Sequence, residues 1–237
     1  MKSYRIRRLD VTASTNDDAV KAAEAGDAEG LVVHALRQTA GRGRHGRTWE
    51  SPEGNLYCSI LLRPTCEPQK YGQYSFMAAL ALGETVQECL PDAHVTLKWP
   101  NDVLVDGKKI GGILLESGQG YLVVGMGLNV HHHPENALYP STCLGLSGGG
   151  VFDLDVILNT LLRHMTRWCD SLKTKDFAPL RAAWLKKAQK GRLTIKSPDE
   201  SVEGDFIDID GQGHLRLRLA DGAERIMATG DVFYRGH

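Results

Sequence analysis

The feature that most limits the possible folds is a dense run of short apolar segments between Val95 and Val130. This run contains Asp106-Gly107 between the apolar stretch 103–105 and the next segment. Asp-Gly flanked by apolar residues is the strongest short signal for a β-hairpin, because both residues readily adopt the positive φ of a two-residue turn. The sequence therefore predicts a sheet that is at least partly antiparallel.

The segments around this region mix further strands with helices. Ser14 and Thr15 are natural N-cap residues, and Gly26 follows the Ala/Glu run as a stop, so a helix is expected between them. Apolar runs and helical periodicity give the remaining elements. We expect strands over 4–9, 31–36 and 56–62, an amphipathic helix over 76–90, a loop over 131–150, and helices over about 153–172 and 176–188.

The sequence pattern changes at Gly191. From there it alternates short strand-like segments with turns such as Asp210-Gly211. A β module of about 45 residues would be marginally stable alone, so we expect it to pack on the larger domain. The sequence thus predicts one domain over 1–189 and a small C-terminal β domain over 190–237.

Composition excludes several classes of protein. The chain has 28 Lys and Arg against 29 Asp and Glu, a net charge of −1, which excludes a globally basic nucleic-acid binder but not a local basic patch. The five cysteines are scattered and never form CxxC, which argues against a disulfide framework and a zinc cluster. Neither a signal peptide nor a membrane-spanning stretch is present. We expect a cytoplasmic protein without a structural metal.

The segment GRGRHGRTW, residues 41–49, has neither helical nor strand periodicity and lies between two expected strands. Its first six residues spell GxGxxG, which marks a dinucleotide-binding turn only when a helix opens directly behind it. Residues 47–54 are turn-forming instead, so this interpretation is not favoured.

An anion clamp is the better interpretation of the same loop. Arg42, Arg44 and Arg47 bring three guanidinium groups close together, and the glycines between them let backbone N–H groups approach an anion. A solvated basic loop is the alternative, since most charge runs face water. Trp49 favours nucleotide binding, because an aromatic ring beside an anion clamp can stack on a base.

A second polar segment follows downstream. Lys98–Asp102 (KWPND) combines a cation, an amide and a carboxylate around a proline. Lys108 and Lys109 are neighbours in an expected strand, so only one of them can enter a site on a given face. Glycines inside strands permit close approach of a ligand or backbone, which predicts a floor for a flat small molecule beside a phosphate pocket. These glycines are Gly111, Gly112, Gly125 and Gly127.

Taken together, these motifs resemble the biotin–protein ligases. The matching segments, in order, are Ser14-Thr15-Asn16, Gln38, GRGRHGRTW, SPEGNLYCSILLRP, KWPNDV, KIGGIL and GMGLNV, and they cover nearly the whole chain. The resemblance implies an enzyme that joins biotin to ATP, releases pyrophosphate, and passes biotin from biotinyl-5′-AMP to one lysine of a biotin carboxyl-carrier protein, a subunit of acetyl-CoA carboxylase. It implies an α+β fold, in which a mixed, largely antiparallel sheet with helices, similar to class II aminoacyl-tRNA synthetases, precedes a small SH3-like β-barrel.

The resemblance also implies roles for individual residues. The biotin pocket would be lined by Ser14, Thr15, Gln38, Gly41, Arg42, Lys109 and Gly112. ATP, which enters with Mg²⁺, would be held by Arg44, Arg47, Trp49, Asn101 and Asn129. The catalytic residues would be Lys109, Arg42 and Asp102. The role of Asp102 stays open between orienting Lys109, contacting the acceptor lysine and helping to hold the metal, and no metal ligand is assigned.

Two alternative functions stay open at this point. A lipoate–protein ligase shares the superfamily, and a non-enzymatic nucleic-acid-binding module would use the arginine loop and the barrel; the motifs and the net charge favour biotin. Ser14 lies almost at the start of the chain, so we expect no N-terminal helix-turn-helix domain and no operator DNA as partner. We expect no membrane partner and leave a homodimer open. His131–His133 is discounted as a metal site, because three consecutive side chains cannot converge on one ion.

Overall fold

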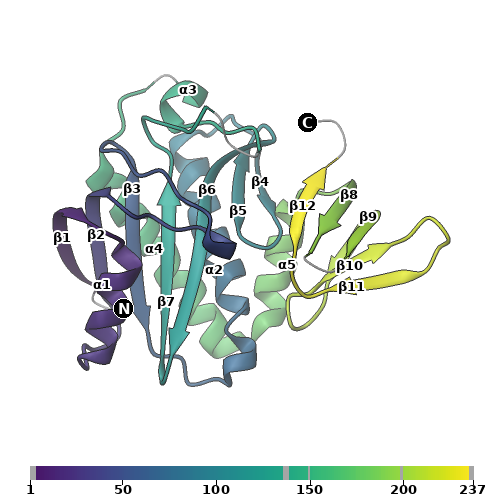
Figure 1. Ribbon diagram of the computed structural model, residues 1–237, viewed down its shortest axis with the longest axis horizontal. Helices are drawn as coiled ribbons and strands as arrows, with labels where there is room; N and C mark the ends of the chain where they lie inside the picture. The colour runs from purple at the N-terminus through teal and green to yellow at the C-terminus, as the bar shows by residue number, and fades with distance from the viewer. Residues whose placement is uncertain (1–3, 136–138, 149, 198–199, 235–237) are drawn as a thin grey trace.

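A seven-stranded sheet forms the centre of the computed structural model, which describes residues 4–135, 139–148, 150–197 and 200–234 (Figure 1). Its strand order is β1-β2-β3-β7-β6-β5-β4, and among these strands only β1 and β2 pair in parallel. The expected mixed, largely antiparallel sheet is confirmed. The strands are β1 (Arg5–Thr12), β2 (Leu31–Gln38), β3 (Leu56–Leu62), β4 (Val95–Lys98), β5 (Asp102–Val105), β6 (Lys108–Gly118) and β7 (Tyr121–Leu128).

The hairpin predicted from Asp106-Gly107 joins β5 to β6. Both turn residues have positive φ, 48° for Asp106 and 78° for Gly107. Two consecutive positive φ values are the geometry that matches the twist of the flanking strands. The expected strand over 56–62 has the observed bounds of β3, whereas β1 and β2 run further than expected, to Thr12 and Gln38.

Helices cover the two faces of this sheet unequally. One face carries α1 (Thr15–Glu24) and the loop before β3, and the other packs against α2 (Gln73–Cys89), α4 (Leu154–Lys175) and α5 (Phe177–Lys187). The expected helix over 76–90 is α2, but the amphipathic expectation is wrong. Most of its side chains are buried, because it lies between the sheet and the helices α4 and α5.

The expected loop over 131–150 is interrupted by a short helix, α3 (Leu144–Gly148); residues 136–138 and 149 of that segment lie outside the described residues. Two short 3₁₀ turns, η1 (Arg44–Gly46) and η2 (Pro68–Lys70), complete the helical elements. Within the described ranges, no helix combines the length and apolar character of a membrane span.

The C-terminal strands form a separate five-stranded antiparallel sheet, which fits an SH3-like fold. Its strand order is β11-β10-β9-β8-β12. The strands are β8 (Arg192–Lys196), β9 (Ser201–Ile209), β10 (Leu215–Arg218), β11 (Glu224–Met227) and β12 (Asp231–Tyr234). The division of the chain between residues 189 and 190 stays a prediction.

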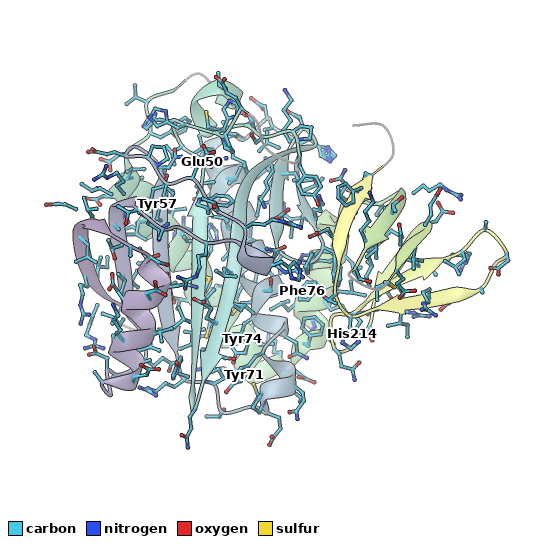
Figure 2. All side chains as sticks on the ribbon, in the orientation of Figure 1. Glu50, Tyr57, Tyr71, Tyr74, Phe76 and His214 are labelled. Atoms are coloured by element: carbon cyan, nitrogen blue, oxygen red, sulfur yellow. The ribbon has the colours of Figure 1, made fainter. Side chains whose placement is uncertain are left out.

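An aromatic cluster joins the two sheets through α2 and α5. Phe76 contacts Trp184 edge-on, with ring centroids 5.1 Å apart, and Trp184 lies 6.5 Å from Phe206 of β9. Figure 2 shows Phe76 beside the turn that carries His214, and in that turn the carbonyl of Gly213 accepts a hydrogen bond from Trp99 Nε1 at 2.9 Å. Burial of these rings fixes the C-terminal sheet on the larger body.

We expect Trp184→Ala to lower the free energy of unfolding by about 3–5 kcal/mol, because it removes a large, fully buried side chain and leaves a cavity. Equilibrium unfolding in guanidinium chloride measures this. The control is Val151→Ala, whose side chain is 99% exposed and whose loss should change stability by less than about 0.5 kcal/mol. Equal stability of the two variants would contradict the packing described here.

Candidate functional site

A cavity of about 320 Å³ opens on the face of the large sheet that carries α1. Its walls come from the arginine loop (residues 41–49), the Lys98–Asp102 segment, β6, β7 and the start of β12. All the residues with an expected site role line it except Gly41. These are Ser14, Thr15, Gln38, Arg42, Arg44, Arg47, Trp49, Asn101, Asp102, Lys109, Gly112 and Asn129. At Gly41 a Cβ would lie 2.5 Å from Ser51 Oγ, so that glycine serves close packing of the loop.

The floor of the cavity is a row of residues that face one another across five strands. The register pairs Lys98 with Asp102, Asp102 with Gly112, Gly112 with Gly127, and Gly127 with Tyr57. Directly opposed residues point to the same side of a sheet. The row therefore places two charged side chains at one end, bare glycines in the middle and a tyrosine at the other end.

A β-bulge brings Lys109 to this same face. Strict alternation would put Lys109 and Gly112 on opposite sides of β6. The pairing with β5 shifts between Val103 and Leu104, so Leu104 pairs with Lys109 and Ile110 is left as the extra residue. Lys109 Nζ then lies 2.6 Å from Asp102 Oδ1, whereas Lys108 is exposed. As alternation requires, one lysine of the pair enters the cavity, and the bulge places that lysine on the same face as Asp102 and Gly112.

Trp49 covers the glycine floor. A Cβ at Gly127 would come within 2.7 Å of the Trp49 indole, and one at Gly112 within 3.2 Å. The ammonium of Lys109 lies 5.3 Å from the centre of the same ring. Of the four glycines expected at the floor, Gly112, Gly125 and Gly127 line the cavity, and Gly125 also makes room for Asn16. Gly111 departs from the expectation, because it faces α2 at Leu82.

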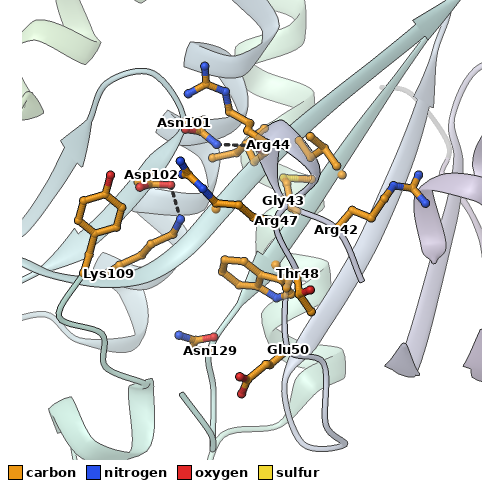
Figure 3. A pocket seen from close by; sticks show the side chains of 18 of the residues that line it. Arg42, Gly43, Arg44, Arg47, Thr48, Glu50, Asn101, Asp102, Lys109 and Asn129 are labelled. Carbon is orange, nitrogen blue, oxygen red and sulfur yellow. Dashed lines mark hydrogen bonds and ion pairs between the residues drawn. The ribbon is translucent and has the colours of Figure 1, made fainter. Parts of the chain in front are cut away.

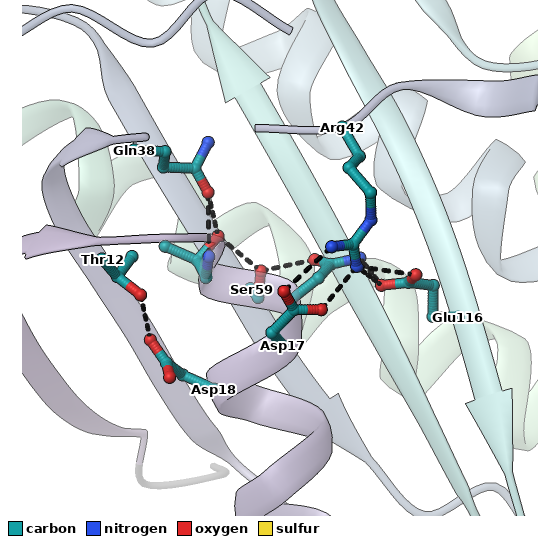
Figure 4. A network of polar contacts seen from close by, with 9 residues as sticks. Thr12, Asp17, Asp18, Gln38, Arg42, Ser59 and Glu116 are labelled. Atoms are coloured by element: carbon teal, nitrogen blue, oxygen red, sulfur yellow. Dashed lines mark hydrogen bonds and ion pairs between the residues drawn. The ribbon is translucent and has the colours of Figure 1, made fainter. Parts of the chain in front are cut away.

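A set of uncharged polar groups closes the end of the cavity near α1 and β2. Gln38 Oε1 accepts hydrogen bonds from Thr15 N at 2.8 Å and Thr15 Oγ1 at 3.0 Å (Figure 4). Gln38 Nε2 donates to Ser51 Oγ. Ser14 is buried, yet within the described residues its hydroxyl has no hydrogen-bond partner, and α1 uses no side-chain cap there. This end can thus offer donors and acceptors to a neutral polar group.

Arg42 is held by two carboxylates that the sequence did not single out. Its Nη2 lies 2.6 Å from Asp17 Oδ1 and 3.0 Å from Glu116 Oε1 (Figure 4). The hydrogen bond from Arg42 lowers the pKa of the Asp17 carboxyl. Glu116 lies 74 positions from Arg42, so no local pattern in the sequence could have paired them.

The other two loop arginines contact the C-terminal sheet. Arg47 Nη1 donates to Asp231 Oδ1 at 2.9 Å, and Arg44 donates to Thr229 Oγ1 at 3.3 Å. The hydrogen bond to Asp231 raises the pKa of Arg47. Figure 3 shows Arg42 directed away from Arg44 and Arg47, so the three guanidinium groups do not converge on one anion as the clamp hypothesis requires. Of these three side chains, those of Arg44 and Arg47 point to the same side of the loop and that of Arg42 points to the other.

The two asparagines have fixed amide orientations. Asn129 Nδ2 donates to the carbonyl of Thr142 at 3.0 Å, and Asn101 Nδ2 donates to that of Ile113 at 2.8 Å. Among the residues the structure describes, this leaves Asn129 Oδ1 as an acceptor without a partner. The same part of the chain contains no cluster of three or more His, Cys, Asp or Glu side chains arranged to hold a metal.

The chain matches two family models. Residues 7–132 match the biotin/lipoate A/B protein ligase family, and residues 192–235 match the biotin protein ligase C-terminal domain. Biotin–[acetyl-CoA-carboxylase] ligases from Paracoccus denitrificans and Mycobacterium tuberculosis are 38% and 37% identical to it, over 95% and 96% of this chain and 98% and 89% of theirs.

A solved structure of similar fold is the biotin protein ligase from Aquifex aeolicus in complex with biotin and ATP. It is 27% identical, has a TM-score of 0.85, and the match covers 96% of this chain and 97% of that one.

Proposed function

The chain belongs to the biotin/lipoate A/B protein ligase family, and we propose that its cavity binds biotin and ATP side by side and carries both steps of biotin transfer. The enzyme is an ATP-dependent biotin–protein ligase, which sets aside the nucleic-acid-binding alternative and does not favour the lipoate ligase. The acceptor is a biotin carboxyl-carrier protein of acetyl-CoA carboxylase.

The observation that carries this proposal is the ion pair of Lys109 with Asp102 above the glycine floor. In the first step a biotin carboxylate oxygen forms a bond to the α-phosphorus of ATP. The bond from that phosphorus to the β-phosphate oxygen breaks, and pyrophosphate leaves with the electron pair. Because two anions must meet, catalysis depends on fixed positive charge and on alignment, and Lys109 supplies the charge where they meet.

The polar end of the cavity suits the ureido group of biotin. That group has one carbonyl acceptor and two N–H donors, and the Ser14 hydroxyl, Thr15 and Gln38 present hydrogen-bonding atoms of both kinds. Trp49 covers Gly112, so its ring has to move for biotin to lie on that floor. If the indole moves toward the nucleotide, it can stack on the adenine ring. Asn129 Oδ1 can then accept a hydrogen bond from the adenine amino group.

Other features support the remaining expectations. Mg²⁺ enters as the counter-ion of the ATP substrate. Residues 190–237 act as a domain that closes one wall of the site, through the contacts of Asp231 and Thr229 with the arginine loop. All five cysteines are free thiols, which supports a reducing compartment such as the cytoplasm.

We expect isotope exchange between ATP and pyrophosphate that depends on biotin, with biotinyl-5′-AMP as the product detected by mass spectrometry in the absence of an acceptor. Lipoate in place of biotin should support little exchange. Exchange that does not depend on biotin, or that is faster with lipoate, would contradict the proposed function.

Lys109→Ala should slow formation of biotinyl-5′-AMP by about ten- to a hundredfold, because a charged hydrogen bond of about 1.5–3 kcal/mol to the reacting anions is lost. Single-turnover adenylation measures the effect. The matched control is Lys108→Ala, which removes an exposed lysine one residue away and should leave the rate unchanged. A larger loss in the control would show that the bulge assignment is wrong.

Arg44→Gly should keep adenylate synthesis near that of the wild type but release the adenylate faster, by about tenfold or more for one lost charged hydrogen bond. Arg44 bridges the loop to Thr229 and Gly230, so its loss frees the loop that closes over the intermediate. Filter binding measures dissociation, and biotinylation of albumin reports released adenylate.

The control for added loop flexibility is His45→Gly, at a residue whose φ of 57° glycine adopts without strain. It should retain the adenylate. Unchanged dissociation in the Arg44 variant, or a loss of synthesis as deep as in Lys109→Ala, would rule out a retention role.

A further inference from the structure

Lys98 is a charged residue of the cavity to which no function has yet been assigned. It is the last residue of β4, it is only 7% exposed, and it stands directly opposite Asp102 in the floor row. Its side chain lines the cavity. The ammonium Nζ lies over the face of Tyr139, 3.5 Å from the ring centre.

The other cations of the cavity already have anionic or carbonyl partners, whereas Lys98 does not. Lys109 pairs with Asp102, and Arg47 pairs with Asp231. Within the part of the chain that the structure describes, Lys98 makes no ion pair and donates no hydrogen bond. A buried ammonium with three idle N–H donors is costly, and such groups in native proteins are normally satisfied. Because Lys98 lines the cavity, an anion bound there can supply the missing acceptor.

The charges that face Lys98 come from every neighbouring wall. They are Asp102 on β5, Lys109 on β6, Asp231 on β12 and Arg47 of the loop, with the Tyr139 ring above. The pKa of Lys98 is lowered to about 8, chiefly because the side chain is buried; Lys109 and Arg47 add to the lowering, and Asp102 and Asp231 oppose it. Lys98 is thus charged at neutral pH and loses its proton in the mildly alkaline range.

The strand order gives the direction in which this end of the cavity lies. Ser14 and Gln38 lie toward the β1–β2 edge of the sheet, Lys109 and Gly112 lie on β6, and β4 with Lys98 is the opposite edge. Phosphoryl transfer is in line, so the leaving group departs on the side opposite the attacking oxygen. With biotin at the polar end, that side is the Lys98 end.

Resting on the proposed function, we propose that Lys98 binds the β- and γ-phosphates of ATP and stabilises pyrophosphate as it leaves. The α-phosphorus to β-phosphate oxygen bond breaks, the oxygen keeps the electron pair, and the growing negative charge meets the ammonium, which keeps its proton. Lys98 acts in the adenylation step and leaves transfer to the acceptor lysine to other groups.

The test compares Lys98→Met and Lys98→Arg with the exposed-lysine control Lys108→Met in ATP–pyrophosphate exchange. We expect Lys98→Met to lower kcat/KM for ATP by about ten- to a hundredfold and to weaken inhibition by pyrophosphate by a similar factor. The KM for biotin should stay within about twofold in all three variants. Lys98→Arg should recover most of the loss, because arginine also donates to phosphate. Calorimetric binding of biotin alone shows that each variant is folded.

A pH profile separates a role for the charge from a merely structural role. Anion binding favours protonated Lys98, so the wild-type KM for ATP should rise as pH passes about 8, the pKa of the free enzyme's Lys98. That rise should vanish in Lys98→Arg, since arginine stays charged throughout.

The second half-reaction, transfer of biotin to the acceptor lysine, provides the result that could overturn the proposal. Transfer from purified biotinyl-5′-AMP to a recombinant carrier domain should be unchanged in Lys98→Met. Slowed transfer with intact ATP kinetics would make Lys98 a base for the acceptor lysine and overturn the proposal, as would kinetics equal to those of Lys108→Met. A wild type without biotin-dependent exchange would instead overturn the proposed function itself.

Discussion

The arrangement of the site depends on one extra residue in β6. The bulge at Ile110 turns Lys109 onto the face that already carries Asp102 and Gly112, and without it the lysine and the glycine would lie on opposite sides of the sheet. Ile110 itself is fully buried against the helices of the far face, which holds the bulge in place. In the proposed mechanism, a cation fixed over bare backbone meets two anions with little reorganisation, so this preorganisation would be the main source of catalysis.

Two of the three arginines in the loop over residues 41–49 are paired with carboxylates. Arg42 and Arg47 use carboxylates of α1, β6 and β12, and these ion pairs are about one-fifth to two-fifths exposed. Pairs with that exposure are worth about 1 kcal/mol or less, so a phosphate or a carboxylate can displace them at small cost. These ion pairs therefore hold the loop in one arrangement. A bound anion has to replace only weak interactions with the carboxylates. Lys98 differs, since among the described residues it contacts the Tyr139 ring but pairs with no carboxylate.

Much of the fold could be predicted from local chemistry, whereas contacts between side chains distant in sequence could not. Asp106-Gly107 determines its hairpin through φ alone, and the apolar run 56–62 is bounded by polar residues on both sides, so both could be read from neighbours. The burial of α2 from two sides depends on where α4 and α5 return. Gly111 directly follows the bulged residue Ile110, but a glycine inside a strand does not distinguish a bulge from the close approach of a ligand. The Glu116 partner of Arg42 is set by strand register, which no local pattern of the sequence encodes.

The small C-terminal sheet forms part of the cavity wall. Its strand β12 holds Arg47, and the residues just before that strand hold Arg44, so the position of the sheet sets the position of the loop. That position is fixed by the ring cluster of Phe76 and Trp184 and by the hydrogen bond from Trp99 to Gly213. Trp99 belongs to the same turn as Lys98 and Asp102. Lys98 thus contributes charge to the cavity, while the next residue, Trp99, anchors the opposing wall, so the geometry of this end of the cavity depends on the packing of the core.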